Sequence, residues 1–135
     1  MKKDIPFLPV EGVHIAVTRY MERSSTESWQ VYIINKNVFP IENVFIRSKG
    51  YGYNRDGEKQ ETSVLRHHLP VLDAKSYAMI ELIMPEVFHL NNEYWVSYFI
   101  AQQVYDKKFI FVPDSIIEAN LSYIPEIKMQ GVLHL

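Results

Sequence analysis

The stretch YWVSYFIAQQVYDKKFIFV, residues 94–112, decides the fold class. Apolar and polar residues alternate along two runs, 94–101 and 104–112, and the polar pair Gln102-Gln103 lies where the runs meet. Alternation with a period of two is typical of strands that bury one face. Two such runs around a short polar segment predict an antiparallel hairpin, which is the clearest element of the chain.

Shorter runs of the same kind, broken by turn residues, occur along most of the remaining chain. We expect strands at residues 13–21, 29–34, 42–48, 62–67 and 76–82. Residues 29–34 have little polar face, which indicates a central strand. Pro70 is expected to end the strand at residues 62–67. Since no long helical period separates these runs, the pattern predicts an all-β fold, an antiparallel β-sandwich of about seven to eight strands.

The sequence also predicts two short helical turns and two extended ends. Pro85 suits the first position of a helix, and Ser115 with Glu118 has the spacing of a capping box. Residues 1–12 are expected to form an extended N-terminal arm, and residues 13–120 the sandwich domain. Residues 121–135 are expected to form a C-terminal tail, in which residues 131–133 can add an edge strand.

Composition excludes several classes of protein. With 47% hydrophobic and 22% charged residues, the 135-residue chain has the composition of one globular domain. Its formal net charge of −2 provides no global positive field to attract nucleic acid or acidic membranes. No apolar stretch approaches the length of a spanning helix, and the absence of cysteine favours the cytoplasm.

Residues 90–97, LNNEYWVS, resemble the fibronectin type III sequence around its tyrosine corner. In that family a leucine lies four residues before a tyrosine that opens an alternating strand, as Leu90 lies before Tyr94 here. The resemblance implies an immunoglobulin/fibronectin III-like sandwich. It also implies that the Tyr94 hydroxyl bonds to backbone upstream and holds the crossover between the sheets.

A broader resemblance covers residues 35–52, 90–96 and 105–111. These segments are similar to a small family of uncharacterised bacterial β-sandwich proteins, some of which are labelled as a phenylalanyl-tRNA synthetase subunit. A class II synthetase core needs a large antiparallel sheet with arginines for ATP. The sequence does not support that label, because 135 residues of sandwich do not contain such a core.

No catalytic, cofactor or metal motif is present in the sequence. His67 and His68 are adjacent, so on a strand they point to opposite faces and do not chelate one ion together. The sequence contains no cysteine, no G-x-S-x-G motif and no phosphate loop. We therefore expect a protein that is not an enzyme and that has no cofactor. The enzymatic alternative is a site in which the fold brings His14 beside His67 or His68.

The segment from residue 47 to residue 59 is the strongest candidate for binding. It is predicted to be a long loop, and it contains basic and tyrosine side chains between glycines: Arg47, Lys49, Tyr51, Tyr53, Arg55 and Lys59. One interpretation is a loop that engages a protein partner, or a second copy of the chain, with β-augmentation at an exposed edge strand as the other route. RNA binding by the same loop is the alternative function. The structural interpretation is an ordinary hairpin loop whose tyrosines pack on the sheet.

Overall fold

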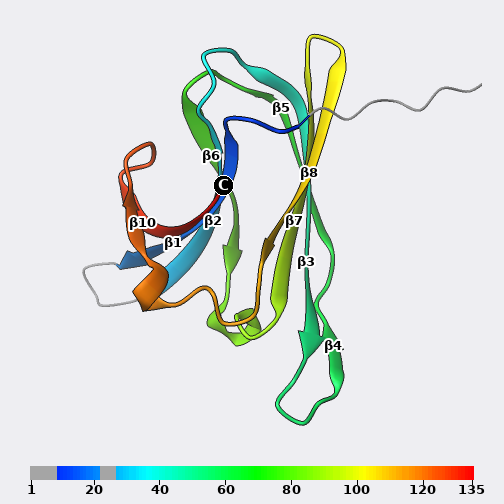
Figure 1. The fold of residues 1–135 in the computed structure, drawn as a ribbon, viewed down its shortest axis with the longest axis vertical. Coiled ribbons are helices and arrows are strands. Elements are labelled where there is room, and N and C mark those ends of the chain that lie inside the picture. Colours follow the sequence, from blue (N-terminus) through cyan, green and yellow to red (C-terminus); the bar gives the residue numbers. More distant parts are fainter. Residues whose placement is uncertain (1–8, 22–26) are drawn as a thin grey trace, which may run out of the picture.

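The computed structural model describes residues 9–21 and 27–135, which form two antiparallel sheets packed face to face (Figure 1). The elements are β1 (Val13–Met21), β2 (Glu27–Asn35), β3 (Ile41–Tyr53), β4 (Lys59–Glu61), β5 (Leu65–Leu72), β6 (Ser76–Ile83), η1 (Pro85–Val87), β7 (Asn91–Ile100), β8 (Gln103–Phe111), η2 (Glu118–Asn120), β9 (Ser122–Ile124) and β10 (Met129–His134). The predicted all-β sandwich is confirmed.

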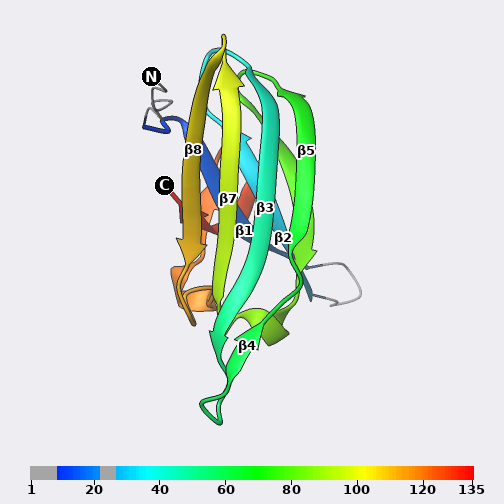
Figure 2. The same ribbon diagram turned by 90° about the vertical axis from the view of Figure 1, so that its right-hand side faces the viewer.

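The first sheet has the strand order β6-β2-β1-β10-β9, so β2 is central, as its apolar pattern predicts. The second sheet has the order β5-β3-β7-β8, and β4 pairs with the far end of β3 (Figure 2). The described residues contain more strands than the sequence indicates. The reason is that β4 and β9 have only three residues each, too few for alternation to show.

The core lies between the inner faces of the two sheets. Its members are alternate residues of the long strands, among them Val13, Ile15 and Val17 of β1 and Tyr94, Val96 and Tyr98 of β7. Burying these side chains provides the main driving force for folding, at roughly 25 cal/mol per Å² of apolar surface. Helices contribute little, since η1 and η2 are single 3-10 turns. Neither of these described helices is long and apolar enough to span a membrane.

The C-terminal residues are part of the first sheet and not the expected tail. β10 pairs with β1, with Val132 opposite Val17, and β9 forms the outer strand beyond it. β9 covers β10 only along residues 129–131, so within the described residues Val132 and Leu133 pair with β1 alone and lie at the sheet edge predicted for residues 131–133. Gly131 permits the close approach, because an added Cβ would lie 2.9 Å from the backbone oxygen of Val17. Ile124 and Ile127 then cover the outer face of the sheet in a second, smaller core.

Three other local predictions differ from the structure or lie outside it. β5 begins at Leu65 and continues through Pro70, which an edge strand tolerates because one of its sides makes no ladder bonds. The capping box does not form, because the Ser115 hydroxyl donates to the carbonyl of Val112 at 2.7 Å and η2 begins only at Glu118. Of the predicted arm, residues 1–8 lie outside the described residues, and residues 9–12 form no strand.

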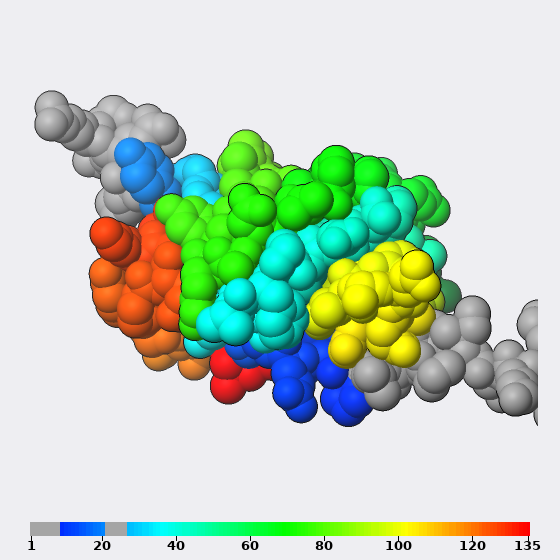
Figure 3. Space-filling model, turned by 90° about the horizontal axis from the view of Figure 1, so that it is seen from above, coloured from blue at the N-terminus to red at the C-terminus, as the bar shows by residue number. Residues whose placement is uncertain are grey.

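One end of the sandwich is closed by Asn35, the last residue of β2. The β7–β8 turn (yellow), the β2–β3 connection (cyan) and the β5–β6 turn (green) lie at this end in Figure 3. The buried Asn35 amide donates to the carbonyls of Phe39 at 3.0 Å, Leu72 at 3.3 Å and Asp73 at 3.0 Å. Its side-chain oxygen accepts from the Asn37 N–H at 3.0 Å. One side chain therefore joins the β2–β3 and β5–β6 connections, the two of the described chain that cross between the sheets at this end.

Asn35→Ala should destabilise the fold strongly, because it leaves several buried backbone groups without a partner. We expect a loss of about 3 kcal/mol in the free energy of unfolding, measured by denaturant titration. Asn120→Ala is the matched control: it removes one exposed bond, to the Ser115 carbonyl, and should cost less than about 1 kcal/mol. Equal losses in the two variants would contradict the structural role of Asn35.

Candidate binding surfaces

Residues 47–59 do not form the predicted loop. β3 continues to Tyr53, and the chain then turns and returns in β4 from Lys59. The glycines that suggested mobility serve close packing instead. An added Cβ at Gly50 would lie 2.9 Å from Cγ2 of Thr62, and Gly52 has a φ of +152°, which L side chains rarely adopt. The segment is therefore a regular hairpin extension of the sheet.

The alternation of β3 places Arg47, Lys49 and Tyr51 on the outer face of the sheet. Lys49 lies directly opposite Glu93 of β7, with its Nζ 5.4 Å from the centre of the Tyr51 ring. The Tyr51 hydroxyl lies 3.5 Å from Oε1 of Glu93, and burial together with this carboxylate raises the pKa of Tyr51. A carboxylate therefore accompanies Lys49, which weakens the case for a basic site here.

The remaining candidates of the segment lie at or beyond the end of β3. Tyr53 is 67% exposed at the end of β3, and Arg55 lies in the following turn. Lys59 forms an exposed ion pair with Glu61 at 3.8 Å, which contributes little stability. Among the six residues of the predicted loop, only Arg47 retains an unbalanced charge within a structured surface.

The histidines do not converge. His67 and His68 point to opposite faces of β5, as expected: the His67 Nε2 lies 2.7 Å from Glu81, while His68 stacks on Phe45 with ring centres 4.5 Å apart. His14 has different neighbours, and its pKa is lowered by burial and by the charges of Lys36 and Lys107. The described residues therefore do not assemble the enzymatic site that combined His14 with His67 or His68.

Glu81 of β6 is the residue that the sequence did not single out. It lies between the sheets with its side chain 12% exposed, and side chains from three strands of the opposite sheet contact its carboxylate. The hydroxyl of Ser48 donates to Oε1 at 2.8 Å, the hydroxyl of Tyr94 donates to Oε2 at 3.2 Å, and the His67 Nε2 lies 2.7 Å from Oε1. Ser48 and His67 both contact the carboxylate instead of each other. The cluster therefore connects the sheets and is not arranged as a catalytic triad.

The hydrogen bond predicted for the tyrosine corner does not form. Tyr94 lies near the start of β7 and is fully enclosed, as is Leu90 before it. Its hydroxyl donates to the Glu81 side chain and not to upstream backbone as expected. Burial is the main cause that raises the pKa of Tyr94 well above 10, and the Glu81 carboxylate adds to it.

A groove opens between β5 and β6, the edges of the two sheets on one side of the sandwich. It has a volume of about 210 Å³, with Glu81, Ser48 and Tyr94 among its lining residues. Apolar side chains also line it: Leu65, Leu82, Ile83, Met84 and Val87. Leu65, Leu82 and Met84 are exposed, so the sandwich presents apolar surface on this side.

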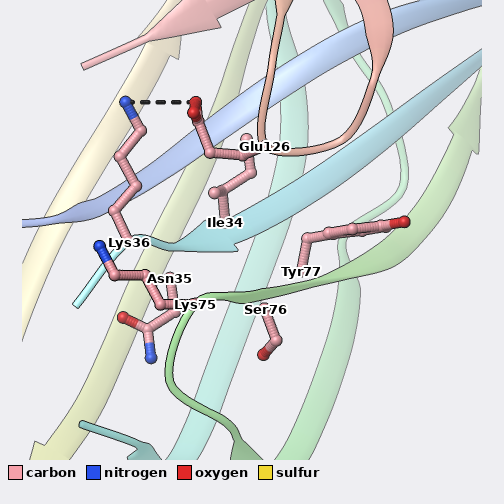
Figure 4. A pocket seen from close by; sticks show the side chains of 7 residues that line it. All are labelled: Ile34, Asn35, Lys36, Lys75, Ser76, Tyr77 and Glu126. Atoms are coloured by element: carbon pink, nitrogen blue, oxygen red, sulfur yellow. Dashed lines mark ion pairs between the residues drawn. The ribbon is translucent and has the colours of Figure 1, made fainter. Parts of the chain in front are cut away.

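A second hollow lies on the outer face of the first sheet, where β2 ends and β6 begins (Figure 4). Its charged side chains are largely paired, since Lys36 Nζ lies 3.4 Å from Oε1 of Glu126, the ion pair drawn as a dashed line. Asn35, which also lines it, already donates to three backbone carbonyls. In this hollow of about 300 Å³ the Ser76 hydroxyl donates to the Asp73 carbonyl at 2.6 Å, which leaves Lys75 and the Tyr77 hydroxyl as the reactive groups without a hydrogen-bond partner among the described residues.

Residues 9–21 and 27–135 contain no cluster of three or more histidine, aspartate or glutamate side chains that could hold a metal ion. No protein-family model, curated protein or solved structure matches the chain. The arguments for function therefore rest on the surface of this molecule alone.

Tyr94→Phe and Tyr98→Phe form a matched pair that tests the Glu81 cluster. Both tyrosines are buried in β7, but the Tyr98 hydroxyl has no hydrogen-bond partner among the described residues. Removing the Tyr94 hydroxyl should cost about 1.5–3 kcal/mol, because it breaks a bond to a charged group. Tyr98→Phe should leave the free energy of unfolding unchanged or raise it. Chemical denaturation measures both, and a larger loss for Tyr98→Phe would contradict the described contacts.

Alkaline pH should destabilise the chain, because burial raises the pKa of both Tyr94 and Tyr98 in the folded state. The unfolded chain releases these protons above its pKa of about 10, whereas the folded chain retains them. The contribution of these two tyrosines to the free energy of unfolding is therefore fully present below about pH 10, and it falls as the pH rises further. Tyr94→Phe should make this fall less steep in thermal melts between about pH 9 and 12. An unchanged slope would contradict the assignment.

Proposed function

We propose that the chain is a non-enzymatic protein-interaction module that binds its partner by β-augmentation at the free edge of β6. In the part of the chain that the structure describes, β6 pairs only with β2. Its other side presents unpaired backbone N–H and C=O groups, on which a further strand can form a ladder. The partner strand comes from another protein or from a second copy of this chain.

The observation that carries this proposal is that β6 lacks the proline, the outward-pointing charges and the short length that protect the other sheet edges. A bulge in its ladder with β2 and the inward-pointing Glu81 are the edge-blocking features that it does have. β8 has Asp106, Lys107 and Lys108 in sequence, and β5 has Pro70. β4 and β9, which also lie at edges, have only three residues each. Charge, proline and short length are the usual means by which proteins block edge pairing. β6 reads SYAMIELI over eight residues, and its single charged residue, Glu81, points inward.

The side chains beside this edge are suited to a protein partner. Tyr77, Met79 and Leu82 lie exposed on the outer face of β6, and the exposed Met84 follows the strand. Fully burying an apolar side chain stabilises a contact by roughly 1.5–3 kcal/mol before the costs of association are subtracted. Methionine adapts its shape to different partners. A strand added here would gain both backbone bonds and apolar contact.

The finer classification is part of the same proposal. The orders β6-β2-β1 and β3-β7-β8 correspond to E-B-A and C-F-G of immunoglobulin-like sandwiches, which supports an immunoglobulin-like arrangement with β9 and β10 added. A cytoplasmic location stays a prediction that rests on the absence of cysteine. A non-enzymatic role is supported by Glu81, whose oxygens are already occupied by Ser48, His67 and Tyr94.

Leu82→Lys tests the proposal, because it places a charge beside the free edge at a side chain that is 59% exposed. We expect it to abolish capture of the partner from RNase-treated host lysate while leaving the melting temperature unchanged. If the partner is a second copy, sedimentation velocity should show a dimer for the unmodified chain and a monomer for the variant.

Val38→Lys is the matched control, since Val38 is 78% exposed and lies in the connection between β2 and β3, beside the start of β6 and at the opposite end of that strand from Leu82. It should retain the partner and the oligomeric state of the unmodified chain. The proposal is wrong if Leu82→Lys captures the same proteins and sediments like the control. Loss of every captured protein on RNase treatment would favour RNA binding instead.

A further inference from the structure

The strand register places four side chains in one row across the outer face of the second sheet. Arg66 of β5 lies opposite Arg47 of β3, Arg47 lies opposite Trp95 of β7, and Trp95 lies opposite Lys108 of β8. Neighbouring strands are about 4.8 Å apart, so the row spans roughly 14 Å. This face is turned to the viewer in Figure 2.

Trp95 holds the middle of this row in a fixed position. The Arg47 guanidinium carbon lies 5.3 Å from the centre of the indole, and the Lys108 ammonium nitrogen lies 4.5 Å from it. The indole N–H donates to Oδ1 of Asp106 at 2.6 Å. The ring therefore holds two cations by cation–π contacts, and its N–H binds the carboxylate of Asp106.

The charges of the row are not neutralised. Arg47 and Arg66 are direct cross-strand neighbours, an arrangement of like charges that destabilises a sheet. None of the ion pairs among residues 9–21 and 27–135 involves Arg47, Arg66 or Lys108. Moreover, the buried Nε of Arg47 has no hydrogen-bond partner within the same residues. In the next row, by contrast, Lys49 lies opposite Glu93.

A hollow of about 270 Å³ lies beside the arginine pair. Its side-chain lining combines two cations, Arg47 and Arg66, with two aromatic rings, Phe45 and Trp95, and it also contains Ser97 and the carboxylate of Asp106. Phe45 is stacked on His68 and is half exposed, so part of its surface remains available to a ligand. The hollow thus offers two guanidinium groups next to an apolar surface.

We infer that this hollow binds a phosphate monoester, with the phosphoryl oxygens held by Arg47 and Arg66 and the aromatic or apolar part of the ligand against Phe45. Guanidinium groups hold phosphate oxygens through paired N–H bonds. A phosphoryl group carries about −1.5 to −2 charges at pH 7, which suits the two guanidinium groups of the hollow better than a single carboxylate does. These two cations outnumber the one carboxylate of the lining, Asp106. The site lies on the other sheet from β6 and does not depend on the proposed function.

Phenyl phosphate is the probe that tests this inference, by NMR titration of the full chain. It should shift the Trp95 indole resonance and the amides around Arg47. Arg66→Ala should weaken its binding at least tenfold, and since Arg66 is exposed the variant should fold normally. Phe45→Ala should weaken phenyl phosphate but not inorganic phosphate. Lys49→Ala, a lysine of the same face with a carboxylate opposite, is the control and should bind normally.

Two further ligands separate this chemistry from its alternatives. Benzoate has the ring with a single negative charge, and it should bind at least tenfold more weakly than phenyl phosphate. A single-stranded RNA without a terminal phosphate should not compete with phenyl phosphate. The inference is overturned if Arg66→Ala binds phenyl phosphate like the unmodified chain, or if benzoate binds equally well. Tighter, Arg66-dependent binding of the RNA would assign the face to nucleic acid instead.

Discussion

The Glu81 carboxylate is the contact on which the open side of the sandwich depends. It belongs to β6 of one sheet and interacts with Ser48, His67 and Tyr94, which lie on three strands of the other. A buried carboxylate is costly unless its oxygens are hydrogen-bonded, and both oxygens of Glu81 are occupied. These three contacts of Glu81 form only when the two sheets have one particular alignment. Apolar packing alone would allow a wider range of alignments.

This arrangement holds β6 in place while its outer edge remains free. A strand at the end of a sheet can fray, but the inward Glu81 anchors β6 at the middle of the sandwich. The apolar side chains Tyr77, Met79 and Leu82 are then presented on a fixed strand. A preorganised edge loses less conformational entropy when a partner binds than a mobile loop does. The same residue therefore serves the stability of the fold and the readiness of the proposed interface.

Sequence periodicity predicted the long strands well, because alternation depends only on local chain geometry. β1, β2, β6 and the β7–β8 hairpin all appear where their patterns indicated. Features that depend on which strands pair, and in which register, could not be predicted from this periodicity. A bulge between Val31 and Tyr32 in the β2–β6 ladder shifts the register, so Glu81 points inward although it continues the alternation of Tyr77 and Met79. The position of β10 in the first sheet likewise depends on strand pairing, because β10 pairs with the side of β1 that β2 leaves open.

The functional surfaces were harder to predict for the same reason. The basic and aromatic residues of 47–59 looked like one site in sequence, yet Lys49 lies opposite Glu93, Lys59 pairs with Glu61, and Arg55 lies in the turn beyond β3. The row of Arg66, Arg47, Trp95 and Lys108 comes from four strands, and only their register brings it together. Single-sequence patterns contain no information about register between distant strands.

Amide hydrogen exchange along β6, at a concentration at which the chain sediments as a monomer, measures the central claim most directly, since it reports whether the edge is open. We expect the β6 amides that point away from β2 to exchange without protection, while amides of β1 and β2 in the same sheet are strongly protected. Protection of the outward β6 amides as strong as that of β2 would contradict the account, because it would mean that the edge is already covered.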